Sequence, residues 1–213
     1  MRRLVIVTVA WQLQLTMLHV PAAAAPLHDR LLAVVDTTTV AASDIALARG
    51  LGVLGFAPAS APIERADVEH FVDVLLILDE ATRMGITVDS ADTEAAWARM
   101  LARVGSEATL ERWLDGHAID RDWARRLVEM DVLRLRFFDE RFAAIVFVDE
   151  EQIDREVGPG QHDEAARAHA RERLTRATAD RLQAEWLEAA RRQAAIRLLI
   201  PDGAAIPPPF PLP

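Results

Sequence analysis

The segment DRLLAVVDTTTVAASDIAL, residues 29–47, decides the fold class. It begins with an apolar run, Leu31–Val35, which predicts a β-strand, and it passes through Asp36–Thr39 before a helix that begins at Ser43. A β-hairpin on its own is only marginally stable in water, so this one needs a further strand. The other strand signal of the chain lies at the far end, Ile196–Ile200, where Pro201 follows. We therefore expect both chain ends to join in one small sheet.

The turn of this hairpin departs from the common pattern. Asp36 is followed by three threonines, and β-branched side chains disfavour the positive φ angles that a tight primed turn requires. The sequence thus predicts a wider turn, which would keep the hairpin but shift its register.

Between the hairpin and the last strand, apolar residues recur at helical spacing. Gly85, followed by Ile86, predicts a left-handed helix end. Expected first residues or N-caps are Ser43, Pro62, Asp89 or Ser90, Ser106, Asp120 and Asp149. The predicted helices cover residues 43–51, 62–84, 90–104, 106–116, 120–146, 149–157 and 163–193. The fold class is therefore mainly α, with one small sheet formed by an N-terminal hairpin and a C-terminal strand.

The first 25 residues resemble a signal peptide. Arg2 and Arg3 precede an apolar stretch, and Ala22–Ala25 offers the small residues that signal peptidase prefers. We expect export to the periplasm with cleavage near Ala24 or Ala25. The alternative is an uncleaved membrane anchor, although polar residues interrupt the apolar run. The expected organisation is a signal peptide over 1–25, a single domain over 26–200 and a proline-rich tail over 201–213.

Composition excludes several classes of function. With no cysteine, the chain has no disulfide, thiolate metal site or cysteine nucleophile. With 33 acidic against 24 basic residues, it lacks the basic footprint of a general nucleic-acid binder. Every basic residue apart from histidine is arginine, so a phosphate-binding loop with its lysine is absent. We expect no ATP-driven activity and no cofactor.

No catalytic or metal-binding pattern is specific. Of the four serines, Ser43, Ser90 and Ser106 stand where helices begin, and no nucleophile elbow occurs. His162 and His169 are spaced to share a helix face, but solvent-exposed histidines explain them as well. The carboxylates of residues 149–156 either begin a helix or bind calcium, although the calcium-loop pattern is missing. We predict no catalytic, cofactor or metal residue.

Aromatic residues leave two questions open. The residues Trp97, Trp113, Trp123 and Trp186 have the spacing of core positions, and the alternative is an exposed groove built from some of them. The tail IPPPFPLP, residues 206–213, is either disordered or docked in an apolar groove through Phe210. The sequence does not identify residues that would bind a client polypeptide.

The order of these motifs resembles that of SurA-type periplasmic chaperones. Their first segment follows VAVVN-x-x-VI-x-x-SD, their second ends in A-x-x-x-GI-x-V, and their third ends at V-x-V-x-x-E-x-I. The resemblance covers about residues 29–157 and more loosely the last helix and strand. Matching positions are Val34, Val35, Val40, Ser43 and Asp44; Ala81, Gly85, Ile86 and Val88; and Val146, Val148, Glu151 and Ile153.

The resemblance implies a SurA N-terminal-like chaperone domain that assists outer-membrane protein assembly and protein folding. In the family, peptidyl-prolyl isomerase domains of the parvulin type are inserted where this chain has only residues 157–163. We therefore expect no enzyme activity. The expected function is ATP-independent binding of unfolded polypeptides, outer-membrane proteins among them, through an apolar groove. The alternative is a non-catalytic assembly or dimerisation subunit for one secretion partner.

Overall fold

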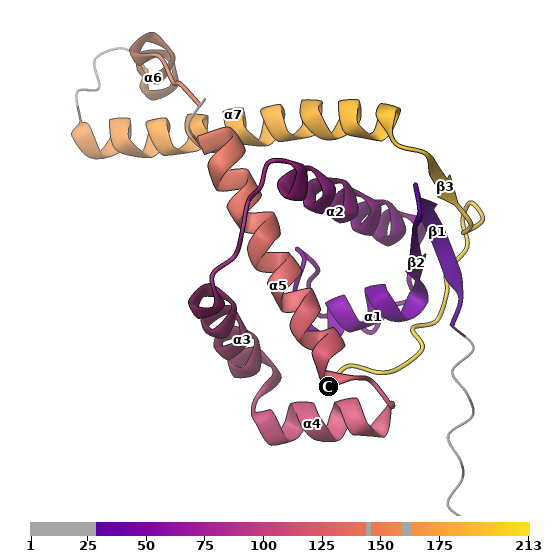
Figure 1. The fold of residues 1–213 in the computed structure, drawn as a ribbon. Coiled ribbons are helices and arrows are strands. Elements are labelled where there is room, and N and C mark those ends of the chain that lie inside the picture. Colours follow the sequence, from indigo (N-terminus) through magenta and orange to yellow (C-terminus); the bar gives the residue numbers. More distant parts are fainter. Residues whose placement is uncertain (1–28, 144–145, 159–162) are drawn as a thin grey trace, which may run out of the picture.

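The structure is a computed structural model that describes residues 29–143, 146–158 and 163–213. The predicted signal peptide, its cleavage site near Ala24 or Ala25, and His162 lie outside the described residues. Helices dominate the described chain, and one small sheet accompanies them, which confirms the predicted fold class (Figure 1). The elements are β1 (Leu31–Val35), β2 (Thr38–Ala41), α1 (Ala42–Leu51), α2 (Arg65–Arg83), α3 (Ser90–Val104), α4 (Glu107–Gly116), α5 (Arg121–Phe138), η1 (Asp139–Ala143), α6 (Glu150–Val157), α7 (Glu164–Gln193) and β3 (Ile196–Leu198).

The sheet joins the two ends of the described chain, as predicted. Its strand order is β2-β1-β3, and both pairings are antiparallel. Val34 lies opposite Thr39 on one side and opposite Arg197 on the other. The central position of β1 explains its apolar sequence, because the strand is flanked on both edges and Leu32 and Ala33 are fully buried.

The hairpin turn is tighter than the sequence predicts. Val35 pairs with Thr38, so the turn contains only Asp36 and Thr37, and the prediction of a wider turn is wrong. Asp36 takes the left-handed conformation, with φ of 51°, and Thr37 needs no positive φ. Aspartate tolerates this conformation better than threonine does. The Asp36 backbone N–H also donates to the Ala195 carbonyl at 3.0 Å, and its Oδ1 accepts from the Ala195 N–H at 3.0 Å.

Replacing Asp36 by alanine is expected to lower the free energy of unfolding by about 1–3 kcal/mol, because alanine loses the bond to Ala195 and disfavours positive φ. Urea denaturation of the purified protein measures the change. Asp36→Asn is the matched control, since asparagine retains an acceptor oxygen and tolerates the left-handed region. Equal stability of the two variants would contradict the role assigned to this side chain.

Two helix starts differ from the predicted ones. α1 begins at Ala42 rather than at Ser43, and the Ser43 N–H and hydroxyl donate to the Asp29 carboxylate instead of Ser43 acting as N-cap. The Ala41 N–H donates to the Asp44 carboxylate at 2.8 Å. The pKa of Asp44 is raised above its ordinary value, mainly by burial and also by the nearby charge of Asp29. The hydrogen bond from the Ala41 N–H acts in the opposite direction but is outweighed. The N–H groups at the start of this helix thus find partners in the Asp29 side chain and in the Arg30 carbonyl, to which the Ala42 N–H donates at 2.9 Å.

The second differing start is that of α2. The helix begins at Arg65 rather than near Pro62, because Ile63 is held in an extended bridge with Ile206 from the C-terminal tail. Asp67 accepts a hydrogen bond from the Glu64 N–H at 2.7 Å. Sequence alone gives no sign of the long-range bridge that delays this helix.

Other helix ends follow the prediction. Gly85 has φ of 73°, its N–H donates to the Thr82 carbonyl, and the Ile86 N–H donates to the Ala81 carbonyl. This pair of bonds is the Schellman motif, and Ile86 packs in the core as the motif expects. Asp89 is the N-cap residue of α3, without a side-chain cap bond. The side chains of the predicted N-caps Ser106, Asp120 and Asp149 each accept a backbone N–H of the helix that they precede.

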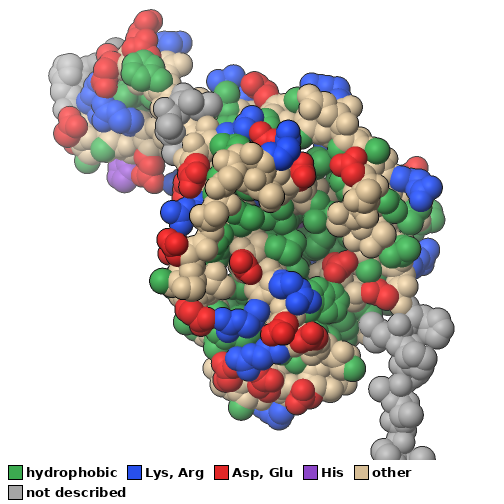
Figure 2. Space-filling view, viewed as in Figure 1, with side chains coloured by type: hydrophobic (Ala, Val, Ile, Leu, Met, Phe, Trp, Pro, Cys, Tyr) green, Lys and Arg blue, Asp and Glu red, His purple; other side chains and the backbone are tan. Residues whose placement is uncertain are grey.

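The predicted helix over 120–146 is α5 followed by the π-helical turn η1. α7 then runs alongside α2, while its first half, with α6 packed on it, extends away from the body (Figures 1 and 2). Ile153 of α6 is fully buried in this projecting lobe. Among the described residues, no helix is both long enough and apolar enough to cross a membrane.

Most buried apolar residues of the described chain fall into two clusters. The larger one joins the sheet to α1–α5 and includes Trp97, Trp113, Met100 and Phe210. The smaller one lies where α2, α5 and η1 meet α7; its buried residues are Ile77, Ala81, Ile86, Phe137 and Phe142, and Trp186 packs against them. Trp186, which packs on this second cluster, also lines a pocket between α2 and α7.

Candidate functional site

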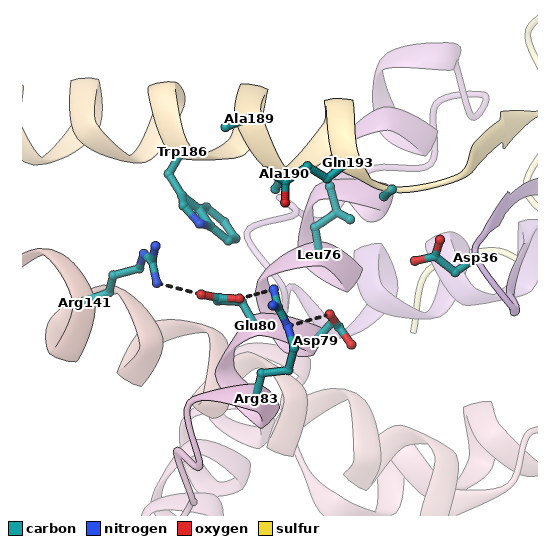
Figure 3. Close-up of a pocket in the computed structure, with 11 residues that line it drawn as sticks. Asp36, Leu76, Asp79, Glu80, Arg83, Arg141, Trp186, Ala189, Ala190 and Gln193 are labelled. Carbon is teal, nitrogen blue, oxygen red and sulfur yellow. Dashed lines mark hydrogen bonds and ion pairs between the residues drawn. The ribbon is translucent and has the colours of Figure 1, made fainter.

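A pocket of about 560 Å³ lies between α2 and α7 (Figure 3). It adjoins a second hollow of about 310 Å³ over the hairpin turn, and the two share Asp36, Leu76 and Asp79. We call the two together the α2–α7 groove. Its lining residues are Val35, Asp36, Thr37, Thr38, Leu75, Leu76, Leu78, Asp79, Glu80, Thr82, Arg83, Arg141, Trp186, Ala189, Ala190, Gln193 and Ala194.

α7 supplies one wall of the groove. Charged residues are frequent along this helix, but Trp186, Ala189, Ala190 and the C-cap residue Ala194 recur at steps of one, three and four and turn a narrow apolar face toward α2. The small alanine side chains leave space between α7 and α2, and the large Trp186 side chain bounds the pocket at one end. In Figure 3 the Trp186 ring and Ala190 lie on the α2 side of the helix.

α2 supplies the floor and a charged margin. Arg141 of η1 donates to Glu80 at 2.8 Å, Glu80 also pairs with Arg83, and Arg83 Nε lies 3.2 Å from Asp79 (Figure 3). Glu80 is only 14% exposed, whereas Arg83 and Asp79 are mostly in solvent. The groove is therefore amphipathic, with apolar walls crossed by a row of ion pairs.

Arg141 is held among aromatic rings. Its guanidinium carbon lies 5.2 Å from the centre of the Trp186 ring, 5.7 Å from Phe137 and 5.9 Å from Phe142. A guanidinium over an aromatic face is attracted by the ring's quadrupole, and the attraction is stronger where water is excluded. The π-helical turn that carries Arg141 thus fixes a cation at the junction of α2 and α7.

A further ion pair joins α2 and α7 near the groove. Arg191 Nε and Nη2 each donate to one carboxylate oxygen of Asp73, both at 2.6 Å. Hydrogen bonding to Asp73 raises the pKa of Arg191, so the guanidinium stays charged. This two-pronged geometry sets the position of α7 along α2.

The chemistry of the groove suits binding. Its ionisable side chains are carboxylates and guanidinium groups, most of them paired with each other, and its lining holds no serine, cysteine or histidine. Within the described ranges, no group of three or more histidine, cysteine, aspartate or glutamate residues is placed to hold a metal ion.

The structure accounts for several residues that the sequence singled out. His70 Nε2 donates to the Leu54 carbonyl and His117 Nδ1 to the Trp113 carbonyl, each at 2.8 Å. Trp97 and Trp113 are buried, Trp123 is half-buried, and Trp186 is the tryptophan that lines the α2–α7 groove. His169 is exposed on α7.

The acidic residues of α6 pair with arginines of α7. Glu150 contacts Arg167 and Arg171, and Arg167 also contacts Asp154. The N-cap role of Asp149 and these ion pairs account for the cluster as a helix start that docks on α7. The sequence prediction of a helix start is confirmed, while the pairing with α7 was not predicted.

The α6 lobe is expected to loosen at acidic pH. Hydrogen bonds from Arg171 and Arg167 lower the pKa of Glu150 below its ordinary value. A carboxylate with a lowered folded-state pKa stabilises the docked lobe above its unfolded pKa of about 4.3, and this contribution is lost as pH falls through the folded pKa. Amide hydrogen exchange of α6 between pH 7 and pH 3 measures the effect. Protection of Glu150→Gln that is as pH-dependent as that of the wild type would contradict the assignment.

Comparison with known proteins adds no relative: no protein-family model matches the chain, and a search of curated proteins found no match. The site therefore rests on its own geometry. The sequence did not predict the residues of the α2–α7 groove. Ala189, Ala190 and Ala194 gave no distinct signal, because alanine recurs along the whole of α7.

Proposed function

We propose that this protein is an ATP-independent, chaperone-like protein of the periplasm that binds unfolded polypeptides, outer-membrane proteins among them. The proposal combines the SurA-like order of sequence motifs with a polypeptide-sized groove. The observation that carries it is the amphipathic lining of the α2–α7 groove, where Leu76, Trp186 and alanines stand beside Glu80 and Arg141.

Such a lining fits an extended polypeptide better than a compact ligand. Apolar side chains of the client would gain about 25 cal/mol per Å² of apolar surface buried against the α7 wall. The charged margin would contact client backbone and polar side chains without requiring a particular sequence. Low specificity of this kind is what a protein that holds diverse unfolded chains needs.

A separate hollow, distinct from the two that form the α2–α7 groove, supports the same proposal. It measures about 370 Å³ and lies between η1 and the middle of α7. Its apolar lining includes Phe138, Phe142, Val146 and Ala179. A client segment that passes from the α2–α7 groove to the lobe would meet this hollow next.

The test is aggregation of a denatured outer-membrane protein after dilution, followed by light scattering without ATP. Wild-type protein at near-stoichiometric amounts is expected to suppress the scattering. The variant Ala189→Arg, which places a long charged side chain across the groove, is expected to require about five- to tenfold more protein for the same suppression, a loss of about 1 kcal/mol in client affinity.

Ala184→Arg is the matched control, because Ala184 lies on the exposed side of the same helix and does not line the groove. It is expected to act as the wild type does. Absence of suppression by the wild type would refute the chaperone proposal, and equal activity of the two arginine variants would move the client site away from the α2–α7 groove.

One observation favours a second candidate, a non-catalytic assembly subunit for a single secretion partner. The chain's own tail already occupies an apolar groove near α4, as a dedicated ligand would. Capture of one stoichiometric partner, with no suppression of aggregation, would favour this role. Proline-peptide isomerisation at background rate is expected under either candidate.

A further inference from the structure

The C-terminal tail, residues 206–213, is docked on the body of the protein. It passes α1 and ends near α4 (Figure 1). Ile206 forms an antiparallel bridge with Ile63, with N–H···O distances of 2.7 and 2.9 Å. Phe210 is 5% exposed, whereas Pro207, Pro211 and Pro213 stand in solvent. Of the two alternatives left open by the sequence, the structure shows the docked one.

The groove that receives the tail is formed by Gly50 of α1, Trp113 of α4 and His117, the C-cap residue of α4, and we call it the tail groove. The Phe210 ring meets Trp113 edge-on with centroids 5.4 Å apart, and it lies 5.7 Å from His117. Trp113 Nε1 donates to the Pro211 carbonyl at 2.8 Å. The bond from His117 to the Trp113 carbonyl fixes the second ring.

Gly50 is what allows this close arrangement. A Cβ atom at this position would lie 3.0 Å from Cη2 of Trp113, closer than such contacts normally come, and 3.5 Å from Cδ of Pro213. The indole therefore packs closely against Gly50 of α1, with Pro213 beside it. The result is a slot with aromatic walls and one indole N–H at its edge.

This is the chemistry by which proteins recognise proline-rich segments. Aromatic rings contact the proline faces, an indole N–H bonds to a backbone carbonyl, and the segment is already extended before it binds. Within the described chain, the bond from Trp113 is the one hydrogen bond to residues 207–213, so a single aromatic anchor carries most of the attachment. Detachment of such a segment breaks this hydrogen bond and exposes Phe210, which packs in the larger core cluster.

We propose that the tail groove is a binding site for an extended segment of another polypeptide in which an aromatic residue is flanked by prolines, and that residues 207–213 are its displaceable occupant. The tail groove shares no lining residue with the α2–α7 groove, so this proposal stands independently of the proposed function. The tail itself defines the ligand: Phe210 fills the slot, and the carbonyl after it accepts from Trp113.

Tethering sets the expected affinities. A tail that is covalently attached acts on its groove at an effective concentration of about millimolar, so a free peptide competes poorly with it. Removing the anchor ring by Phe210→Ala weakens the tail but leaves the groove and the Ile63–Ile206 bridge in place. The full-length F210A protein is therefore expected to bind a free peptide that the wild type binds weakly.

The experiment measures fluorescence anisotropy of a labelled PPPFPLP peptide titrated with full-length protein. F210A is expected to bind it at least about tenfold more tightly than the wild type does, as loss of a tethered competitor requires. Pro207→Ala, which changes an exposed tail residue, is the matched control and is expected to act as the wild type does. Far-UV circular dichroism checks that F210A is folded, and Phe210→Leu replaces it if it is not.

A variant peptide and a second substitution in the protein complete the test. A peptide with alanine in place of phenylalanine is expected not to bind, and Trp113→Phe in the F210A background is expected to weaken binding by about two- to tenfold through loss of the indole N–H. No binding to a folded F210A or F210L protein would overturn the proposal and make the tail part of the core. A concentration-dependent dimer of the wild type would also overturn it, because the ligand would then be the tail of a second copy.

Discussion

Replacing Arg49 by alanine is expected to lower the free energy of unfolding by about 3–5 kcal/mol, because the change removes a buried guanidinium whose loss leaves the half-buried Asp67 carboxylate without its ion-pair partner and the Ala61 carbonyl without its donor. Arg49 is 7% exposed in α1, its guanidinium pairs with Asp67, and its Nη1 donates to the Ala61 carbonyl at 2.9 Å. One side chain thus ties α1 to the start of α2 and to the loop before it. Urea denaturation followed by circular dichroism measures the loss.

The control for Arg49 is Arg83→Ala. Arg83 also pairs with two carboxylates, but its side chain is 68% exposed, and such pairs contribute only about 0–1 kcal/mol. Arg49→Met separates the packing of the arginine stem from the ion pair with Asp67, since methionine restores the apolar stem but not the charge. A loss for Arg49→Ala as small as that for Arg83→Ala would show that solvent reaches the pair.

Arg49 also illustrates what the sequence could not predict. In the segment ALARGL an arginine fits an exposed helix position, and the residues that bury it, Ala61 and Asp67, come twelve and eighteen positions later in a loop and another helix. By contrast, the pairing of β3 with β1 was predictable, because the hairpin and the last strand carried the chain's main strand signals and an isolated hairpin is marginal.

Local rules predicted helix ends and failed where distant contacts intervened. Ser106, Asp120 and Asp149 cap helices as expected, because their bonds reach only two or three residues along the chain. Pro62 does not begin α2, because Ile206 holds its neighbour Ile63 in an extended bridge. A bond between residues 63 and 206 has no local signature in either segment.

The α2–α7 groove was unpredictable for the same reason. Leu76 and Ala190 line one pocket although more than a hundred residues separate them, and the match depends on how Asp73 and Arg191 set α7 along α2. The sequence predicted Trp186 on one face of its helix, but not that this face borders a groove. Only the packing of the second cluster, with Phe137 at its centre, determines that Trp186 lines a groove.

Replacing Phe137 by alanine is therefore expected to have the second large effect, a loss of about 3–5 kcal/mol in unfolding free energy. The Phe137 side chain is fully buried, and its ring centre lies 5.0 Å from that of Trp186 and 6.0 Å from that of Phe142. Removing it leaves a cavity at the contact of α5 with α7 and takes away one of the rings around Arg141. Urea denaturation measures the change.

Phe147→Ala is the matched control for Phe137, since Phe147 is 82% exposed and its loss is expected to change stability by less than about 0.5 kcal/mol. Phe137→Ala also distinguishes an effect on stability from an effect on client binding. At a temperature where Phe137→Ala remains folded, loss of aggregation suppression would show that the second cluster holds the Trp186 wall of the groove in place. Full suppression by such a folded variant would mean that clients bind without that wall, and the α2–α7 groove would then not be their site.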